Sequence, residues 1–433
     1  MRDAYLNQLP SEGASLALLL LINTVSINAV LYYVQPGAHL YPWSSIGAIV
    51  LLAAFIPLFA LADFSFGYIA GVAFYGVITS FIWITFVTPL HYDHSLARWS
   101  AAASLFLFLL PLLFQTSRIP PAIALSPVAM DRLLMSAFAF AIVVFAWNAV
   151  YGFAFVGFLN PEQLPDNFGR PSVLKYLTGS LTGGVLPFAF AYFACQRRFA
   201  MAAIAIALNA CFYPFMLNRT LILAVVWLPF LFVVFRMFKP KRAAVFALFA
   251  PMAISLVIFK IAPSGDYGYR LSDYFFELTN YRMFAIPAMA MDRFSDFFAS
   301  HELTHFCQIR LIAAIKGNCP YPSPLSDVME AYFHAGKLNA SLFATEGIAS
   351  VGPYLAPLSA LVCGLVLSIG NSVSARLSPC LIAVSSGLVV QSLVNTPLST
   401  NVLSSGLLAL FVLWSLTPEP VADALPHPSA PPG

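Results

Sequence analysis

Repeated apolar runs of about 20 residues constrain this chain more than any other feature. Hydrophobic residues make up 60% of its 433 residues, whereas charged residues make up 9%. Soluble domains carry about a quarter charged residues, and an α-helix needs about 20 apolar residues to cross a bilayer. The runs are continuous, whereas the strands of a transmembrane β-barrel would alternate. The sequence therefore predicts an all-α, polytopic integral membrane protein.

We expect about twelve transmembrane helices. Their residue ranges are 14–34, 45–63, 66–90, 99–116, 133–158, 173–195, 199–217, 220–238, 243–262, 352–370, 377–394 and 401–417. The apolar run at 199–238 is about twice as long as a bilayer is thick at ~1.5 Å per residue, so it must fold back as a hairpin. Asn218-Arg219 interrupts this run and places Arg219 at the turn.

The distribution of Lys and Arg predicts the orientation. If the N-terminus is cytoplasmic, ten of these residues fall in inner loops and four in short outer loops, which agrees with the positive-inside rule. The inner residues are Arg2, Arg118, Arg132, Arg197, Arg198, Arg236, Lys239, Lys241, Arg242 and Arg376; the outer ones are Arg98, Arg170, Lys175 and Arg219. Both termini are then expected in the cytoplasm.

This topology divides the chain into four parts. Helices fill residues 1–262, a long periplasmic loop region covers 263–351, further helices fill 352–417, and a tail rich in Pro and Ala, expected to be disordered and cytoplasmic, covers 418–433. The loop region is polar: residues 263–350 hold nine of the 18 Asp and Glu residues and three of the seven His residues. Water-facing chemistry is therefore expected in this polar segment.

The polar segment is expected to form short helices. Aromatic clusters alternate with charges at helical spacing from Arg270 to Ile315, a pattern typical of helices that lie along a membrane surface. Ser323-Pro324 predicts the start of another helix that runs through His334. Cys307 and Cys319 either form a disulfide, as an oxidising compartment would allow, or remain reduced, and the sequence leaves both states open.

An H-E-x-x-H motif occupies residues 301–305. On a helix, His301 and His305 would share one face and could hold zinc, with Glu302 as the base for a metal-bound water. Glu330 and His334 would offer a third ligand. This predicts a zinc peptidase as one alternative, but the polar segment is small for such a domain and the many helices exceed what an anchor needs.

Arginines favour a different chemistry. Five of them are expected at or above the outer membrane face: Arg219, Arg270, Arg282, Arg293 and Arg310. Guanidinium groups bind phosphate oxygens in bidentate fashion, and apolar helices beside them would accommodate a lipid tail. A lipid pyrophosphate would suit both features. Alternatively, the arginines pair with local acids, for instance Arg293 with Asp292, Asp296 or Asp273.

Two segments resemble a known family. The hairpin Leu217-Asn218-Arg219-Thr220, followed by an apolar helix and the Lys239–Arg242 turn, is similar to the Ser-Arg-Gly/Thr element of O-antigen polymerases and ligases, although Asn218 replaces the commoner Ser. The stretch from Asn339 through Glu346-Gly347 to Gly352 is similar to the segment that follows the long loop in Wzy-type repeat-unit polymerases. The resemblance covers about residues 199–370.

The resemblance implies a GT-C-like membrane glycosyltransferase. Such an enzyme polymerises undecaprenyl-pyrophosphate-linked oligosaccharide repeat units into O-antigen, capsule or exopolysaccharide at the periplasmic face of the bacterial inner membrane, with no metal or other cofactor. Its expected partners are the lipid-linked oligosaccharide and membrane lipid, together with a chain-length regulator and a flippase, and no nucleic acid. An O-antigen ligase would share this plan. A transporter is disfavoured, because the spans contain almost no ionisable residues at mid-membrane.

Residue roles follow from this implied reaction. The diphosphate leaving group needs a cationic clamp and the acceptor hydroxyl needs a base. Arg219 and Arg282 are expected to form the clamp. The candidates for the base are His301, Glu302, His305 and Glu346. The further substrate-binding candidates are Arg270, Arg293, Arg310 and Asn339.

Overall fold

The computed structural model describes residues 9–34, 42–115, 117, 124–153, 169–261, 271–336 and 340–418. The side chains at 9–12, 32–34, 42–46, 219 and 271 lie outside this description. Within the described residues the secondary structure is helical and contains no β-strand, so the expected all-α class is confirmed for them. Several expected features lie outside the described residues, namely Arg2, Arg118, Arg270, Asn339 and nearly all of the tail.

The helices of the first half of the chain end at Ile261. They are α2 (Leu9–Val34), α3 (Pro42–Ala53), α4 (Ile56–Leu61), α5 (Phe66–Ile84), α6 (His94–Phe114), α7 (Pro127–Val150), α8 (Ser172–Ser180), the π-helix η2 (Leu181–Val185), α9 (Leu186–Cys195), α10 (Phe199–Cys211), α11 (Tyr213–Met216), α12 (Arg219–Met237) and α13 (Pro240–Ile261).

The remaining helices include two further π-helices. They are α14 (Leu271–Phe276), η3 (Glu277–Ala285), α15 (Ile286–Ser300), α16 (Arg310–Lys316), α17 (Leu325–Phe333), η4 (Phe343–Ala349), α18 (Ser350–Ser374), α19 (Pro379–Leu393), α20 (Leu398–Leu403) and α21 (Leu407–Leu416). Helix α17 confirms the helix expected after Ser323-Pro324, and His334 ends it in a left-handed conformation.

In the described part of the chain, nine helices are long and apolar enough to cross a membrane. They span Gly13–Leu31, Phe66–Ile84, His94–Phe114, Pro127–Val150, Ser172–Cys195, Phe199–Met216, Thr220–Met237, Pro240–Ile261 and Phe343–Ser374. The other three expected segments correspond to shorter apolar helices at Gly47–Leu61, Pro379–Leu393 and Leu407–Leu416. The structure thus supports a polytopic membrane protein, and twelve crossings stay a prediction.

Helix α5 forms the centre of the bundle. All of its residues are buried, because α2, α6, α13, α15, α18 and α19 surround it. Glycine permits part of this close packing: a Cβ on Gly67 would stand 2.1 Å from the carbonyl oxygen of Leu112 in α6. The side chain of Asn371 in α18 lies at the same point, where it accepts from the Gly67 N–H (2.6 Å) and donates to the Leu112 carbonyl (2.7 Å).

The hairpin expected at residues 199–238 is confirmed. Helices α10 and α12 pack against each other, and Leu217 turns the chain with a left-handed φ of 50°. The Asn218 side chain accepts from the Thr220 N–H (3.0 Å) and thereby caps α12. A side-chain oxygen at this position satisfies one of the unpaired N–H groups of a helix start. Arg219 is the first residue of α12, as the sequence predicts.

The first part of the polar segment packs into the bundle rather than lying along its surface, so the surface interpretation is wrong for it. Helices α14, η3 and α15 follow one another without a break from Leu271 to Ser300. They contact α2, α5, α13 and η4, and residues on most sides of α15 are buried. The periodicity suggested one apolar face, but aromatic residues such as Phe294 and Phe298 fill space between helices.

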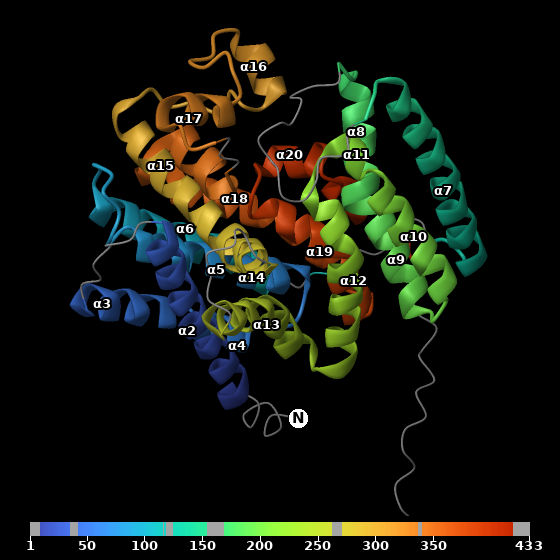
Figure 1. Cartoon of the computed structure of the whole chain (residues 1–433), viewed down its shortest axis with the longest axis horizontal. Helices are drawn as coiled ribbons and strands as arrows, with labels where there is room; N and C mark the ends of the chain where they lie inside the picture. Colours follow the sequence, from blue (N-terminus) through green and yellow to red (C-terminus); the bar gives the residue numbers. More distant parts are fainter. Residues whose placement is uncertain are drawn as a thin grey trace, which may run out of the picture.

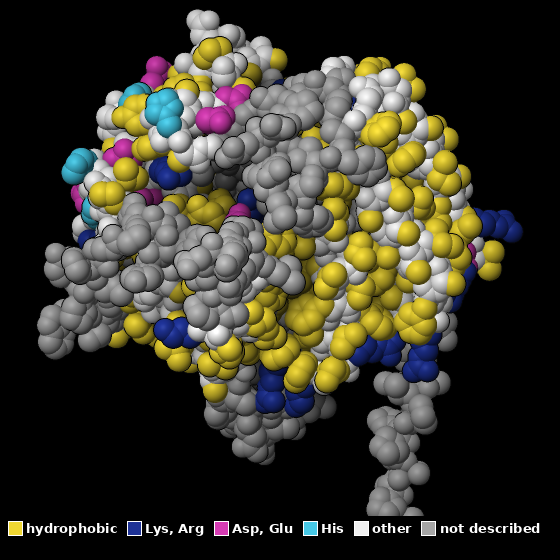
Figure 2. Space-filling model, in the orientation of Figure 1, with side chains coloured by type: hydrophobic (Ala, Val, Ile, Leu, Met, Phe, Trp, Pro, Cys, Tyr) yellow, Lys and Arg dark blue, Asp and Glu magenta, His cyan; other side chains and the backbone are white. Residues whose placement is uncertain are grey.

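Charged side chains separate toward opposite ends of the molecule. In Figure 1, α16 and α17 lie at the top of the view and the turn between α12 and α13 lies at the bottom. In Figure 2, His and acidic side chains gather near the top, hydrophobic side chains form a broad band, and Lys and Arg gather along the lower rim. We call these the polar end, with α16 and α17, and the basic end, with Arg197, Arg198, Arg236 and Lys239, all exposed.

Candidate functional site

The H-E-x-x-H segment is not helical, so the expectation that it presents zinc ligands from a helix is wrong. Helix α15 ends at Ser300, His301 is extended, and His305 has a left-handed φ of 48°. The His301 ring stacks on Phe297 with centroids 3.9 Å apart. Within the described residues, no three His, Cys, Asp or Glu side chains gather as metal ligands would. This geometry gives the peptidase alternative no support.

The motif instead forms part of a compact turn at the polar end. The backbone N–H of Thr304 donates to the carbonyl of Ala349 (2.8 Å), which ties the turn to the start of α18. Glu302 and His305 are exposed. Cys307 and Cys319 form a disulfide with a Cα–Cα distance of 5.8 Å, which resolves the two states that the sequence left open.

The expected arginines have different surroundings. Arg282 forms an ion pair with Glu277 (3.1 Å), the local pairing that the sequence left as an alternative for any of these arginines. Arg310 is exposed at the start of α16, and its guanidinium lies 5.7 Å from the Tyr176 ring centroid in α8. For Arg219 only the backbone position is described, and Arg270 lies outside the described residues. The proposed clamp is therefore not brought together by described side chains.

Arg293 differs from the other arginines. It is half-buried in α15, and among the described residues no carboxylate lies within ion-pair distance of its guanidinium. None of Asp292, Asp296 and Asp273 forms an ion pair with it, although the Asp292 charge still acts on the guanidinium. Its guanidinium lies 5.9 Å from the Phe333 ring centroid. Burial lowers the pKa of Arg293 below the usual value for arginine, because a charged group loses hydration there.

Glu346 is buried in η4 and faces α20. Its carboxylate accepts from the hydroxyl of Thr345 (2.5 Å) and from the backbone N–H (3.3 Å) and hydroxyl (3.4 Å) of Ser399. Ser399 lies in the first turn of α20, where helix N–H groups favour a negative charge. Glu346 is thus bonded within the bundle. It does not line the cavity described next.

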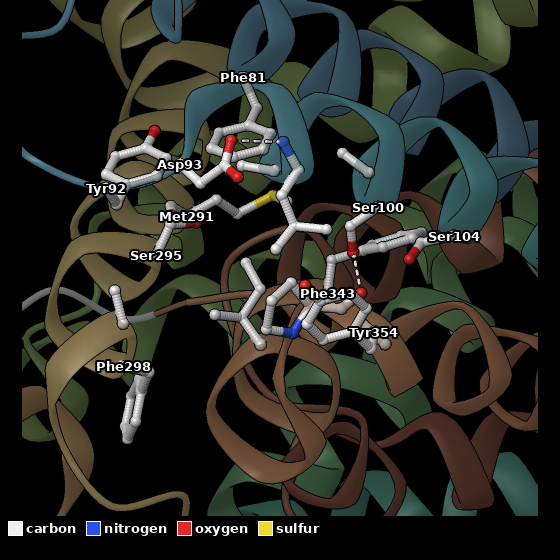
Figure 3. A pocket seen from close by; sticks show the side chains of 17 residues that line it. Phe81, Tyr92, Asp93, Ser100, Ser104, Met291, Ser295, Phe298, Phe343 and Tyr354 are labelled. Atoms are coloured by element: carbon white, nitrogen blue, oxygen red, sulfur yellow. Dashed lines mark hydrogen bonds between the residues drawn. The ribbon is translucent and has the colours of Figure 1, made fainter.

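A cavity of about 450 Å³ lies at the polar end between α6, α15 and the start of α18. In Figure 3, Met291 and Ser295 of α15 form one side, and Ser100 and Ser104 of α6 lie across from them. The Ser100 hydroxyl donates to the carbonyl of Pro353 (2.5 Å), next to a break in α18. Its walls are mostly apolar, with Tyr92 and Asp93 at one margin.

Asp292 is a buried acid beside this cavity, and from the sequence it was expected only as a partner of Arg293. Its carboxylate accepts from the hydroxyls of Thr88 (2.7 Å) and Tyr92. Burial raises the pKa of Asp292, although both hydrogen bonds oppose this shift. Burial and the Asp292 charge also raise the pKa of Tyr92. The sequence carried one signal of this cluster, the polar loop His91-Tyr92-Asp93-His94 between two apolar spans.

Comparisons of this chain with protein-family models, with curated proteins and with solved structures found no match.

Proposed function

We propose that this chain is a membrane glycosyltransferase that polymerises undecaprenyl-pyrophosphate-linked oligosaccharide repeat units at the outer face of the bacterial inner membrane. The resemblance described from the sequence suggests the reaction. One structural observation carries the proposal: Arg293 is half-buried at the polar end, and among the described residues no carboxylate lies within ion-pair distance of its guanidinium. A desolvated guanidinium is costly unless an anion binds it, and a diphosphate suits its fork geometry.

The disulfide of the chain agrees with this proposal, whereas the cavity does not add to it. Met291 and Ser295, which line the cavity, each lie two residues from Arg293, about 200° around the helix. Helix α15 therefore separates Arg293 from the cavity, so the cavity does not place a lipid tail beside this cation. The Cys307–Cys319 disulfide favours an oxidising compartment, as the periplasm is.

In the proposed reaction, an acceptor hydroxyl attacks the anomeric carbon of the lipid-linked donor. The bond from that carbon to the pyrophosphate oxygen breaks, undecaprenyl pyrophosphate leaves, and a base takes the hydroxyl proton. Arg293 would stabilise the charge that develops on the diphosphate. Of the expected bases, Glu302 and His305 are exposed at the polar end, whereas Glu346 is already bonded to Ser399. Glu302 and His305 are therefore the first bases to test.

The test is a gene deletion complemented with variants, read by gel analysis of surface glycans. The deletion should leave single-unit products, and the native chain should restore a ladder of long chains. Arg293→Ala should abolish the ladder at normal membrane levels, whereas Arg293→Lys should restore it in part because it retains the charge without the fork. Arg198→Ala, at the basic end, is the matched control and should give a normal ladder.

Two outcomes would contradict the proposal. A normal ladder with Arg293→Ala would remove Arg293 from the reaction. If the deletion strain still makes long chains on the lipid carrier but does not transfer them to the lipid A core, the chain is an O-antigen ligase.

A further inference from the structure

Two thiols face each other at the basic end. Cys195 is the last residue of α9 and Cys380 is the second residue of α19, and their sulfur atoms lie 3.5 Å apart. No disulfide joins them, and both residues are half-buried. A disulfide has a sulfur–sulfur distance of ~2.05 Å, so the two atoms need to approach by about 1.5 Å. We propose that Cys195 and Cys380 form a modification site, a dithiol that a small disulfide such as oxidised glutathione converts reversibly into a disulfide.

The surroundings favour reaction at Cys380. It lies in the first turn of α19, and the helix start is ordered by Ser378, whose hydroxyl accepts from the Leu381 N–H (3.3 Å). Arg236, the last-turn cation of α12, donates to the Cys195 carbonyl (3.4 Å), and its charge acts on Cys380. A helix N-terminus and a neighbouring arginine both stabilise a thiolate, which is the reactive form of cysteine.

The chemistry balances as two thiol–disulfide exchanges. The Cys380 thiolate attacks one sulfur of oxidised glutathione, which breaks the glutathione disulfide and releases one glutathione thiolate. The Cys195 thiolate then attacks the Cys380 sulfur and releases the second glutathione thiolate. Two electrons pass from the cysteine pair to glutathione, and the two protons that the cysteines lose end on the two glutathione thiols. Reduced glutathione in excess reverses both steps.

The two cysteine pairs of this chain lie at opposite ends of one helix. The disulfide between Cys307 and Cys319 follows the turn that is bonded to Ala349, at the start of α18. After the break at Gly352, helix α18 runs without interruption from Pro353 to Ser374. These 22 residues measure about 33 Å at ~1.5 Å per residue, and Cys380 follows soon after the helix ends. This separation is about that of a bilayer. In the orientation of the proposed function, Cys195 and Cys380 face the reducing cytosol, where they stay thiols until glutathione becomes oxidised.

A closed pair would join α9 to α19 covalently. These two helices contact each other along the bundle, and α12 contacts both. Helix α12 begins at Arg219 at its other end. Oxidation is therefore expected to restrict relative movement of α9 and α19, against which α12 packs.

The experiment uses the full-length protein in detergent, so that every cysteine meets the reagent. The protein is equilibrated with mixtures of reduced and oxidised glutathione, thiols are trapped with a maleimide, and peptides are mapped without reductant. As the oxidised fraction rises, Cys195 and Cys380 should lose labelling together, and their peptides should be found joined to each other. Excess reductant should restore both thiols. Cys195→Ser should leave Cys380 as a mixed disulfide with glutathione, whereas Cys211→Ser should not change the joint loss.

Exposed Cys211 provides the internal reference for reagent access. If Cys211 takes up glutathione while Cys195 and Cys380 both stay labelled, the proposal is wrong. It is also wrong if Cys380 closes onto a different cysteine, or if the native pair yields two separate glutathione adducts instead of peptides joined to each other. The readout is thiol chemistry and not glycan length, so its failure is distinct from failure of the proposed polymerase function.

Discussion

The Tyr92 hydroxyl, in the loop between α5 and α6, donates a hydrogen bond to the buried carboxylate of Asp292 in α15. This contact joins residues 200 positions apart in the chain and ties the polar segment to the loop between two apolar helices, α5 and α6. The Thr88 hydroxyl supports the same carboxylate (2.7 Å). The polar segment is thus held to the bundle by a buried acid and two hydroxyls, one of which, Tyr92, also borders the cavity.

Tyr92→Phe should destabilise the protein at neutral pH. It removes a donor from a buried carboxylate, and a buried acceptor that loses its partner costs about 1–3 kcal/mol. Thermal unfolding in detergent would show this as a lower Tm. Tyr354→Phe is the control, because Tyr354 lines the same cavity but is 79% exposed. Equal melting of the two variants would contradict the assigned hydrogen bond.

Asp292 should make the stability depend on pH. Burial raises its pKa above the ordinary value of 3.8, so the folded state binds this proton more tightly than the unfolded state. The free energy of unfolding from this group therefore falls as pH rises from 3.8 through the raised folded pKa. Melting curves across that range should show the fall in the native protein and in Asp296→Asn, and a flatter profile in Asp292→Asn. Parallel profiles for all three proteins would rule out this linkage.

Gly352→Ala should destabilise the turn at the polar end. Gly352 has φ 75° and ψ 172°, a conformation that is essentially restricted to glycine. A side chain there costs about 1–3 kcal/mol. Gly347→Ala is the matched control, since its added Cβ would meet the Ala356 Cβ at an ordinary 3.5 Å. We expect a lower Tm for Gly352→Ala only. An unchanged Tm would mean that the backbone does not need glycine here.

Gly183→Ala should destabilise the protein, because it forces the backbone of η2 away from the backbone at Ser405. A Cβ at this position would stand 2.1 Å from the carbonyl oxygen of Ser405, and Gly179 and Gly184 approach Ser404 and Gly406 in the same way. Because the neighbour is backbone and cannot rotate away, the expected cost is about 1–3 kcal/mol or more. Gly47→Ala meets nothing within 4 Å and should be neutral or stabilising by up to about 1 kcal/mol. Tm values in the reverse order would contradict this packing.

Loss of the Cys307–Cys319 disulfide should loosen the polar end without unfolding the helices. The two cysteines are 12 residues apart, and closing a loop of that size contributes roughly 3 kcal/mol. The double variant Cys307→Ser/Cys319→Ser should therefore be cleaved faster by protease between residues 301 and 336. Cys211→Ser should match the native protein. Identical cleavage rates for all three would show that the disulfide does not support this region.

Several features followed from the sequence because they depend on local properties. The length of the apolar runs predicted twelve apolar segments. Turn and capping residues predicted the fold-back before Arg219 and the helix after Ser323-Pro324. The H-E-x-x-H motif gave a wrong prediction of zinc ligands. Residues four apart share one face only on a helix, and α15 ends at Ser300, before the motif. The burial of α15 was also missed, because a charged, aromatic segment reads as a surface helix unless its neighbours are known.

The sequence by itself determined that this protein is helical and built for a bilayer, because apolar runs long enough to span one have no other stable solution in lipid. Only the tertiary structure decided which polar residues meet. It bonded Tyr92 to Asp292, left Arg293 without an ion pair in the described residues, closed Cys307 onto Cys319 and set Cys195 beside Cys380. Such pairings depend on how distant helices pack, and the composition of each helix does not encode its neighbours.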